Sequence, residues 1–168
     1  CIKIQHSLSA PLLYNTDLHT AYFVSPTEII SDETTIHTSK GNFNTDVKEA
    51  TLLNRSVIIQ KDGEQTMVGD SIVFNESKGQ AEAFGGVQIR NYPDKIDMDG
   101  EYAYFSQEND SAVVTGNALA VEYSAGDSLY IHADTFRLLT FYNATRDTVR
   151  YREMRAFNKV KAYRTDMQ

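Results

Sequence analysis

An internal repeat constrains the fold of this chain more than any other feature of its sequence. Phe43, Phe74 and Phe105 follow one another at equal intervals of about 31 residues, and Tyr14 stands slightly less than one interval before the first of them. An alanine comes seven residues after each aromatic residue. These alanines are Ala21, Ala50, Ala81 and Ala112. Coincident columns at a fixed period are typical of stacked repeats, in which each copy buries its apolar face against the next.

The residues between each aromatic residue and its alanine are turn formers. Asn follows the aromatic residue in three copies, and Ser106 takes its place in the fourth. Such side chains form hydrogen bonds with nearby backbone groups and interrupt strands. The flanking segments alternate between apolar and polar residues, so each copy is predicted to be a strand, a tight turn and a second strand. In residues 80–90, the apolar face carries Ala81, Ala83, Gly85, Val87 and Ile89.

These hairpins predict an all-β fold, with residues 1–168 as a single domain. We expect about ten antiparallel strands from successive hairpins of about 31 residues, stacked as a β jelly roll or an open β-solenoid. The charged segment 148–157 lacks helical apolar spacing, so it is predicted to be a strand. A final pair is expected over Leu129–Leu139 and Arg155–Met167, separated by the polar connection Asn143–Asp147.

The bulk composition argues against several classes of function. A formal net charge of -7 disfavours nucleic acid as a partner, because affinity for a phosphate backbone comes mainly from Lys and Arg. Cys1 is the only cysteine in the sequence, so no disulfide within the chain is expected. The sequence also contains no run of about 18 apolar residues of the kind that spans a membrane as a helix.

Metal-binding signals are weak. His132 and Asp134 would place two ligands on one face of a strand, whereas zinc usually takes three or four. Asp97, Asp99 and Gly100 match the start of a calcium loop, but no glutamate closes the loop at the required position. We therefore expect no metal site, and we expect a turn at residues 97–100.

Catalytic signals are equally weak. The sequence contains no nucleophile elbow, no phosphate-binding loop and no His-Glu-x-x-His motif. Glu82 and Glu101 raise the question of a glycosidase, whose chemistry needs two acids facing one cleft. Acidic residues are spread along every polar face, however, so these two are predicted to be ordinary surface residues. We expect neither an enzyme nor a cofactor.

Apolar columns at matching positions of the repeats are the candidate binding surface. Stacked strands would place such columns as ladders inside the fold, where the simplest interpretation is a packed core. The alternative is an apolar space that holds an acyl chain, at ~0.8 kcal/mol for each buried methylene. The small residues Ala81, Ala83, Gly85, Gly86 and Gly116 favour that alternative, because they leave volume that a packed interior would fill. The candidate lipid-binding residues are Phe23, Ile29, Phe43, Leu52, Ile58, Ile72, Phe74, Ala81, Ala83, Val87, Ile89, Phe105 and Val114.

The serial order of these short motifs resembles the OstA/LptA family. In that pattern a Gly-acidic start leads to an aromatic residue, a turn and a segment of the form Ala-x-Gly-x-Val-x-Ile. Here residues 69–74 (GDSIVF) are followed by residues 81–89 (AEAFGGVQI), and residues 100–105 (GEYAYF) are followed by residues 112–116. Residues 126–138 and 157–168 are most similar to OstA-like proteins of Bacteroidetes-type bacteria. The resemblance extends over nearly the whole chain from Leu12.

The resemblance implies a twisted β jelly roll in the periplasm, whose interior carries the acyl chains of lipopolysaccharide (lipid A) toward the outer membrane. It also implies that open edge strands join other lipopolysaccharide-transport β domains, or a second copy, end to end. The chain starts and stops within the family pattern, so we expect a fragment of a longer protein. Two features depart from the pattern: Asn54-Arg55-Ser56 replaces Gly85-Gly86-Val87 in the second copy, and the last pair is lengthened. A scaffold that associates through its edge strands, without binding lipid, is the alternative.

Overall fold

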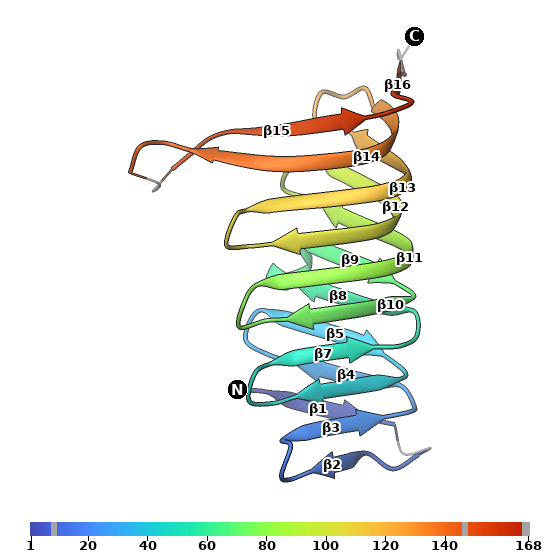
Figure 1. The fold of residues 1–168 in the computed structure, drawn as a ribbon, viewed down its shortest axis with the longest axis vertical. Helices are drawn as coiled ribbons and strands as arrows, with labels where there is room; N and C mark the ends of the chain where they lie inside the picture. Colours follow the sequence, from blue (N-terminus) through green and yellow to red (C-terminus); the bar gives the residue numbers. More distant parts are fainter. Residues whose placement is uncertain (8–9, 146–147, 166–168) are drawn as a thin grey trace.

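The structure is a computed structural model, and it describes residues 1–7, 10–145 and 148–165. In these residues one antiparallel sheet contains sixteen strands, accompanied by a single short 3-10 turn, η1 (Lys61–Gly63). The strands are stacked along the long axis of the molecule (Figure 1). The predicted all-β, hairpin-built fold is confirmed. The predicted number of strands was too low, because before β11 each predicted strand is divided into two short strands where the chain turns a corner.

The sheet is folded lengthwise into two walls. One wall contains β2 (Leu13–Asn15), β3 (Thr20–Phe23), β6 (Gly41–Asn44), β7 (Glu49–Leu52) and β10 (Ser71–Asn75). The opposite wall contains β1 (Lys3–His6), β4 (Thr27–Ile30), β5 (Thr34–Thr38), β8 (Ser56–Gln60) and β9 (Gln65–Gly69). The walls are joined by strands long enough to run through both, which are β11 (Gln80–Asn91), β12 (Ile96–Ser106), β13 (Ser111–Glu122) and β14 (Leu129–Tyr142).

Bulges bend the long strands at the corner between the walls. The register shifts between Phe84 and Val87 in β11, where Gly85 and Gly86 have φ of 75° and 49°. Gly116 (φ 90°) occupies the corresponding shift in β13. These three glycines were predicted to leave interior volume, and that prediction was wrong: they supply the backbone conformation that a bulged corner needs.

Residues 97–100 were predicted to form a turn and instead lie inside β12. Asp97 and Asp99 pair with β11 on one side and with β13 on the other. The bend that the sequence suggested is real, but it is a bulge between Asp99 and Tyr102 within a continuous strand. Sequence alone does not separate a hairpin turn from a bulge of this kind, because both favour glycine and polar residues.

The repeated aromatic residues and alanines form one ladder. Within a copy, Phe43 pairs with Ala50 and Phe74 pairs with Ala81. Between copies, Ala50 pairs with Phe74 and Ala81 pairs with Phe105. Neighbouring strands are about 4.8 Å apart, so a ring recurs about every 10 Å with an alanine between successive rings. The repeat period in the sequence is thus the period at which large and small side chains interdigitate along the stack.

The asparagine after each aromatic residue closes the turn, as predicted. Asn44 Oδ1 accepts hydrogen bonds from the backbone N–H of Asp46 (3.0 Å) and Val47 (3.1 Å). Asn15 Oδ1 accepts the equivalent pair, and Asn75 Oδ1 accepts from Lys78 N–H (2.9 Å). These side chains replace backbone hydrogen bonds that the turn would otherwise leave unmade.

Two further ladders complete the hydrophobic core. One follows the wall of β3 and consists of Phe23, Gly41, Leu52, Ile72, Ala83, Ala103, Val114 and Phe136. The other follows the opposite wall and consists of Ile4, Ile29, Ile36, Ile58, Met67, Ile89, Met98, Ala120 and Ile131. The inward faces of the two walls therefore face each other along the stack.

The C-terminal strands differ in part from the prediction. Segment 148–157 is a strand as predicted, β15 (Val149–Phe157), and it pairs with the second half of β14. The predicted strand Arg155–Met167 was wrong, because Asn158 and Lys159 have φ of 59° and 49° and turn the chain. The chain then pairs β16 (Lys161–Arg164) with the first half of β14. Met167, Arg146 and Asp147 lie outside the described residues. Across the described ranges, no helix has the length and apolar character to cross a membrane.

Candidate functional site

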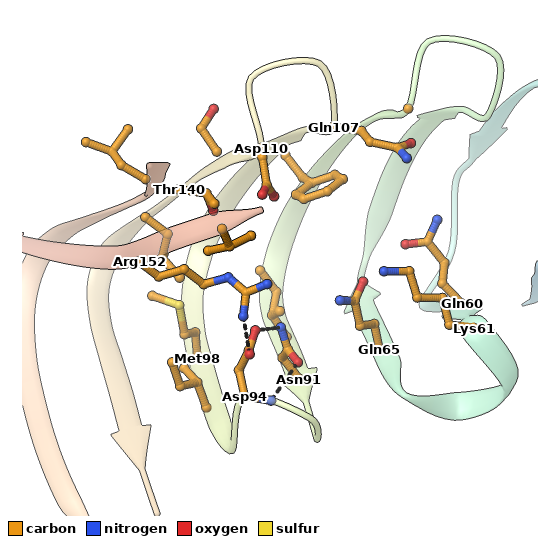
Figure 2. A pocket seen from close by; sticks show the side chains of 18 of the residues that line it. Gln60, Lys61, Gln65, Asn91, Asp94, Met98, Gln107, Asp110, Thr140 and Arg152 are labelled. Atoms are coloured by element: carbon orange, nitrogen blue, oxygen red, sulfur yellow. Dashed lines mark hydrogen bonds and ion pairs between the residues drawn. The ribbon is translucent and has the colours of Figure 1, made fainter. Parts of the chain in front are cut away.

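A groove of about 1020 Å³ lies between the two walls, and its lining extends from the β4–β5 connection to β15. Its apolar lining residues include Phe74, Ile89, Ile96, Met98, Phe105, Leu138 and Met154, and polar side chains such as Gln60, Gln65 and Gln107 line its mouth. Figure 2 shows these polar groups facing the cavity from both walls. The groove therefore has an amphipathic lining, apolar within and polar at the mouth.

The ladders of inward side chains that form the closed core in the N-terminal half of the fold also line the groove farther along the stack. Ile36 and Phe43 are each 2% exposed and line neither the groove nor the smaller cavity beside it, so the space between the walls is filled there. Farther along the same ladders, Ile89 and Phe105 are only partly buried and line the groove. One pattern of inward side chains thus builds a closed core at one end and an open groove at the other.

A smaller cavity of about 110 Å³ adjoins the groove. It shares Phe74, Ile89 and Phe105 with the groove, and Ile58 and Ala81 lie on its far side. This cavity marks the transition from packed core to open groove, because Ile58 and Ala81 are themselves buried.

The predicted lipid-binding residues divide into two groups. Phe74, Ile89 and Phe105 line the groove, and Ile58 and Ala81 line the adjoining cavity. The other eight are no more than 2% exposed, belong to the core and line neither cavity. These eight are Phe23, Ile29, Phe43, Leu52, Ile72, Ala83, Val87 and Val114. A lipid would contact them only if the walls separated.

Several lining residues were missed by the sequence analysis. Met98 follows Met67, and Met67 follows Ile36, at the same interval as the repeated phenylalanines, so the repeat contained the signal for it. Leu138 occupies the aromatic ladder through its pairing with Ala112, but it comes two residues later than one repeat interval after Phe105. The extra residues lie in the connection 123–128, which is longer than the equivalent connection 92–95. This lengthening shifts the last copy out of the repeat period and hides Leu138 and its partner Met154.

The rim of the groove is acidic. Seven carboxylate residues line the groove, namely Asp32, Glu33, Glu76, Asp94, Asp110, Glu122 and Glu153. Three cationic residues accompany them, namely Lys48, Lys61 and Arg152. Hydrogen bonds from the Ser124 hydroxyl and backbone N–H hold the pKa of Glu122 below its usual value. Glu122 is therefore a stable anion at the rim near neutral pH.

Two polar contacts cross the mouth of the groove from wall to wall. Ser31, in the connection between β4 and β5, donates a hydrogen bond to Glu76 in the β10–β11 turn. Arg152 of β15 forms an ion pair with Asp94 in the β11–β12 turn. Figure 2 shows the second contact together with Asn91, whose Nδ2 donates to Asp94 Oδ2 (2.8 Å). The open part of the mouth lies between these two contacts.

The residues considered for metal binding and catalysis have ordinary partners. The His132 ring packs edge-on against Tyr163, and Asp134 lies 3.7 Å from the Lys159 ammonium. In the described ranges of the chain, no three His, Cys, Asp or Glu residues are grouped as a metal site would require.

The two glutamates considered for glycosidase chemistry make separate contacts. Glu82 accepts a 2.6 Å hydrogen bond from the Tyr102 hydroxyl, whose pKa is raised to about 12 by burial and by this bond. Glu101 accepts a 3.4 Å hydrogen bond from the Gly86 backbone N–H at the corner. Neither glutamate lines the groove.

Comparison with known proteins gives one family. Residues 47–126, which span β7 to β13, match the model of a family described as OstA-like protein. A search of curated proteins finds no match. OstA-like proteins are a transport and binding family, typically periplasmic and not known to be enzymatic, with a role in lipopolysaccharide transport and organic-solvent tolerance. The repeat-bearing centre of the chain, residues 47–126, is therefore OstA-like, as the resemblance to the OstA/LptA family predicted.

Proposed function

We propose that this chain binds the acyl chains of lipopolysaccharide (lipid A) in its groove and guides them through the periplasm toward the outer membrane. The observation that carries the proposal is the groove itself: its apolar ladders continue along the stack, and they lie in an OstA-like chain. An enzymatic step is not part of the proposal, since binding and guidance need only a continuous apolar surface.

The chemistry of the groove suits an acyl chain. Its volume is at the upper end of the range typical of small-molecule sites, which is about 300–1,000 Å³. Met98 and Met154 line it with unbranched, adaptable side chains, which accommodate apolar ligands of irregular shape. Burial of ten methylenes would contribute about 8 kcal/mol before the cost of ordering the ligand.

The apolar ladders run along the stack, and this direction favours guidance of an acyl chain over storage of one. Ile89 pairs with Met98, and Leu138 pairs with Met154, so the apolar lining continues from strand to strand along the stack. An acyl chain could move along this lining without burying a polar group, because the polar residues lie at the mouth. Movement would then be passive, and its direction would be set outside this domain.

Site-specific photocrosslinking tests the proposal. A photoreactive amino acid would replace Met98, which lines the groove, or Gln88, which is exposed beside Ile89 and serves as the matched control. In a lipopolysaccharide-producing host, we expect lipid adducts from position 98 and not from position 88. Native mass spectrometry of the purified protein should show co-purified lipid A. Absence of adducts from Met98, Leu138 and Met154 alike would contradict the proposal.

The outer edges of the sheet favour a second candidate, a scaffold that associates by strand addition. Among the described strands, β2 pairs only with β3, and β16 pairs only with β14. Tyr163 in β16 is 55% exposed. Such edges would also join further lipopolysaccharide-transport β domains, or a second copy, end to end.

Analytical ultracentrifugation separates this candidate from the first. The scaffold predicts association that rises with concentration and is lost in Tyr163→Glu, without any lipid adduct from the groove. Normal association of the Tyr163→Glu variant would count against this edge as the contact surface.

A further inference from the structure

The β14–β15 hairpin is longer than the hairpins beneath it and extends over the mouth of the groove. The pairing of β13 with β14 ends at Ser111 and Leu139, whereas β14 continues to pair with β15 as far as Tyr142 and Val149. Figure 1 shows this hairpin reaching beyond the neighbouring turns. Residues in the extension therefore have no equivalent in the other copies.

Side chains alternate along β15, so every second residue of the extension lies on the same inward face as Met154. Met154 pairs with Leu138, and both line the groove. Arg152 is two residues from Met154 and pairs with Thr140, so it lies on the same face of the strand. Its guanidinium thus sits at the mouth directly beside an apolar lining, and it reaches Asp94 on the opposite wall (Figure 2).

We propose that Arg152 is the binding site for the anionic head group of the acyl ligand, with a phosphate as the head group that fits best. Before binding, Asp94 holds the guanidinium, and a bound phosphate takes its place. This inference rests on the proposed function, because it places the acyl chain on the lining formed by Leu138, Met154 and Met98.

The ion pair is suited to such an exchange. The Arg152 side chain is 54% exposed, and ion pairs that accessible to water are weak. A guanidinium binds phosphate through two parallel charge-assisted hydrogen bonds, a stronger arrangement. Asp94 is independently held by Asn91, whose side chain both donates to its carboxylate and accepts from its backbone N–H. Asp94 can therefore release Arg152 without losing its own position.

The charges around the groove favour an anionic head group beside Arg152. Lys48 lies 3.5 Å from Glu76 at the other end of the mouth, and carboxylates outnumber cations along the rim. Glu153 adjoins Arg152 in sequence and also lines the groove, but its ion pair with Arg155 offsets its charge. Lys61 is the third cation of the rim, but Arg152 is the one that shares a strand face with the apolar residue Met154. An anion would be repelled along most of the rim, and an anion attached to an acyl chain on that lining would be attracted at Arg152.

Binding of two amphiphiles with the same tail tests the inference. Dodecyl phosphate and dodecyl maltoside, each below its micelle concentration, would be titrated by calorimetry into the wild-type chain, Arg152→Gln, Asp94→Asn and Arg137→Gln. We expect Arg152→Gln to weaken dodecyl phosphate about tenfold, since charge-assisted hydrogen bonds are lost. Asp94→Asn should tighten it, because the competing carboxylate is removed. Arg137→Gln makes the same change of charge at an exposed residue of β14 that does not line the groove, and it should have no effect.

The maltoside separates failure of this inference from failure of the proposed function. If the maltoside binds and Arg152→Gln leaves phosphate affinity unchanged, the head-group site is wrong and the groove stands. If Arg152→Gln and Asp94→Asn shift both ligands in the same direction, the ion pair merely closes the mouth, and the head-group site is again wrong. If neither amphiphile binds the wild-type chain, the proposed function and this inference both fail. Thermal unfolding of each variant checks that the fold is retained.

Discussion

Replacing Phe43 or Phe105 by alanine tests whether the stack changes from packed core to open groove along one ladder. The two residues are equivalent by sequence, since each is the aromatic residue of its copy and pairs with an alanine on both sides. They differ in environment: Phe43 is 2% exposed inside the core, whereas Phe105 is partly buried and lines the groove. Each variant is therefore the control for the other.

The expected losses of stability differ because only one substitution leaves a sealed cavity. Phe→Ala in an enclosed core costs about 3–5 kcal/mol, so Phe43→Ala would remove a large share of a typical stability of about 5–15 kcal/mol. Phe105 already borders open space. If about two thirds of the ~150–250 Å² of a phenylalanine side chain is buried there, the loss is about 3 kcal/mol at ~25 cal/mol/Å². The difference between the variants should be about 1 kcal/mol.

Equilibrium urea unfolding, followed by far-UV circular dichroism and by tyrosine fluorescence, measures this difference. Two probes are needed because stacked repeats can unfold in parts, and coincident curves would justify a single free energy of unfolding. If the free energies of unfolding of Phe43→Ala and Phe105→Ala agreed within about 0.5 kcal/mol, the distinction between core and groove along this ladder would be wrong.

Three further substitutions test other parts of the structure. Gly41→Ala should lower the free energy of unfolding by about 1–3 kcal/mol more than the control Gly63→Ala, as measured by chemical denaturation. A Cβ at Gly41 would lie 2.2 Å from a backbone oxygen of β7, whereas a Cβ at Gly63 would have no atom within 4 Å. Tyr102 keeps its proton in the folded state up to a pKa of about 12, against 10.0 for the model phenol, so stability should be complete below pH 10 and should fall as the pH rises toward 12. Tyr102→Phe should flatten that fall in melting temperature, and an unchanged profile would contradict the assignment. Within the described residues the buried Ser106 Oγ has no hydrogen-bond partner, so Ser106→Ala should keep or raise the melting temperature, and a loss of stability above about 1 kcal/mol would reveal a missed partner.

The repeat made most of the fold predictable because it reflects direct cross-strand pairs. Phe74 and Ala81 are seven residues apart in sequence and opposite each other in the sheet, so a spacing in the chain became a contact in space. Alternation then assigned inward and outward faces. The repeat spacing and the alternation both arise within one hairpin, so both can be recognised from a single sequence.

The candidate site was less predictable, because it depends on how far apart the two walls lie. Ile29 and Ile89 occupy the same ladder, yet Ile29 is in the core and Ile89 lines the groove. No property of the two residues distinguishes them. The corner was also misjudged, because Gly85 and Gly86 were credited with leaving volume when their positive φ angles serve a bulge.

The repeated pattern of inward side chains therefore indicates a function only when the departures from the repeat are considered with it. A perfectly periodic stack would bury every residue of a ladder equally, and the two walls would be packed together along their whole length. Here the lengthened connection 123–128 moves the last copy out of period, and the long β14–β15 hairpin carries the inward face past the rim. Arg152 and most of the apolar lining of the groove lie toward this irregular end, whereas Phe23 and Phe43 at the regular end are packed. The regular copies thus build the rigid part of the stack, and the departures from the repeat create the surface on which a ligand can bind.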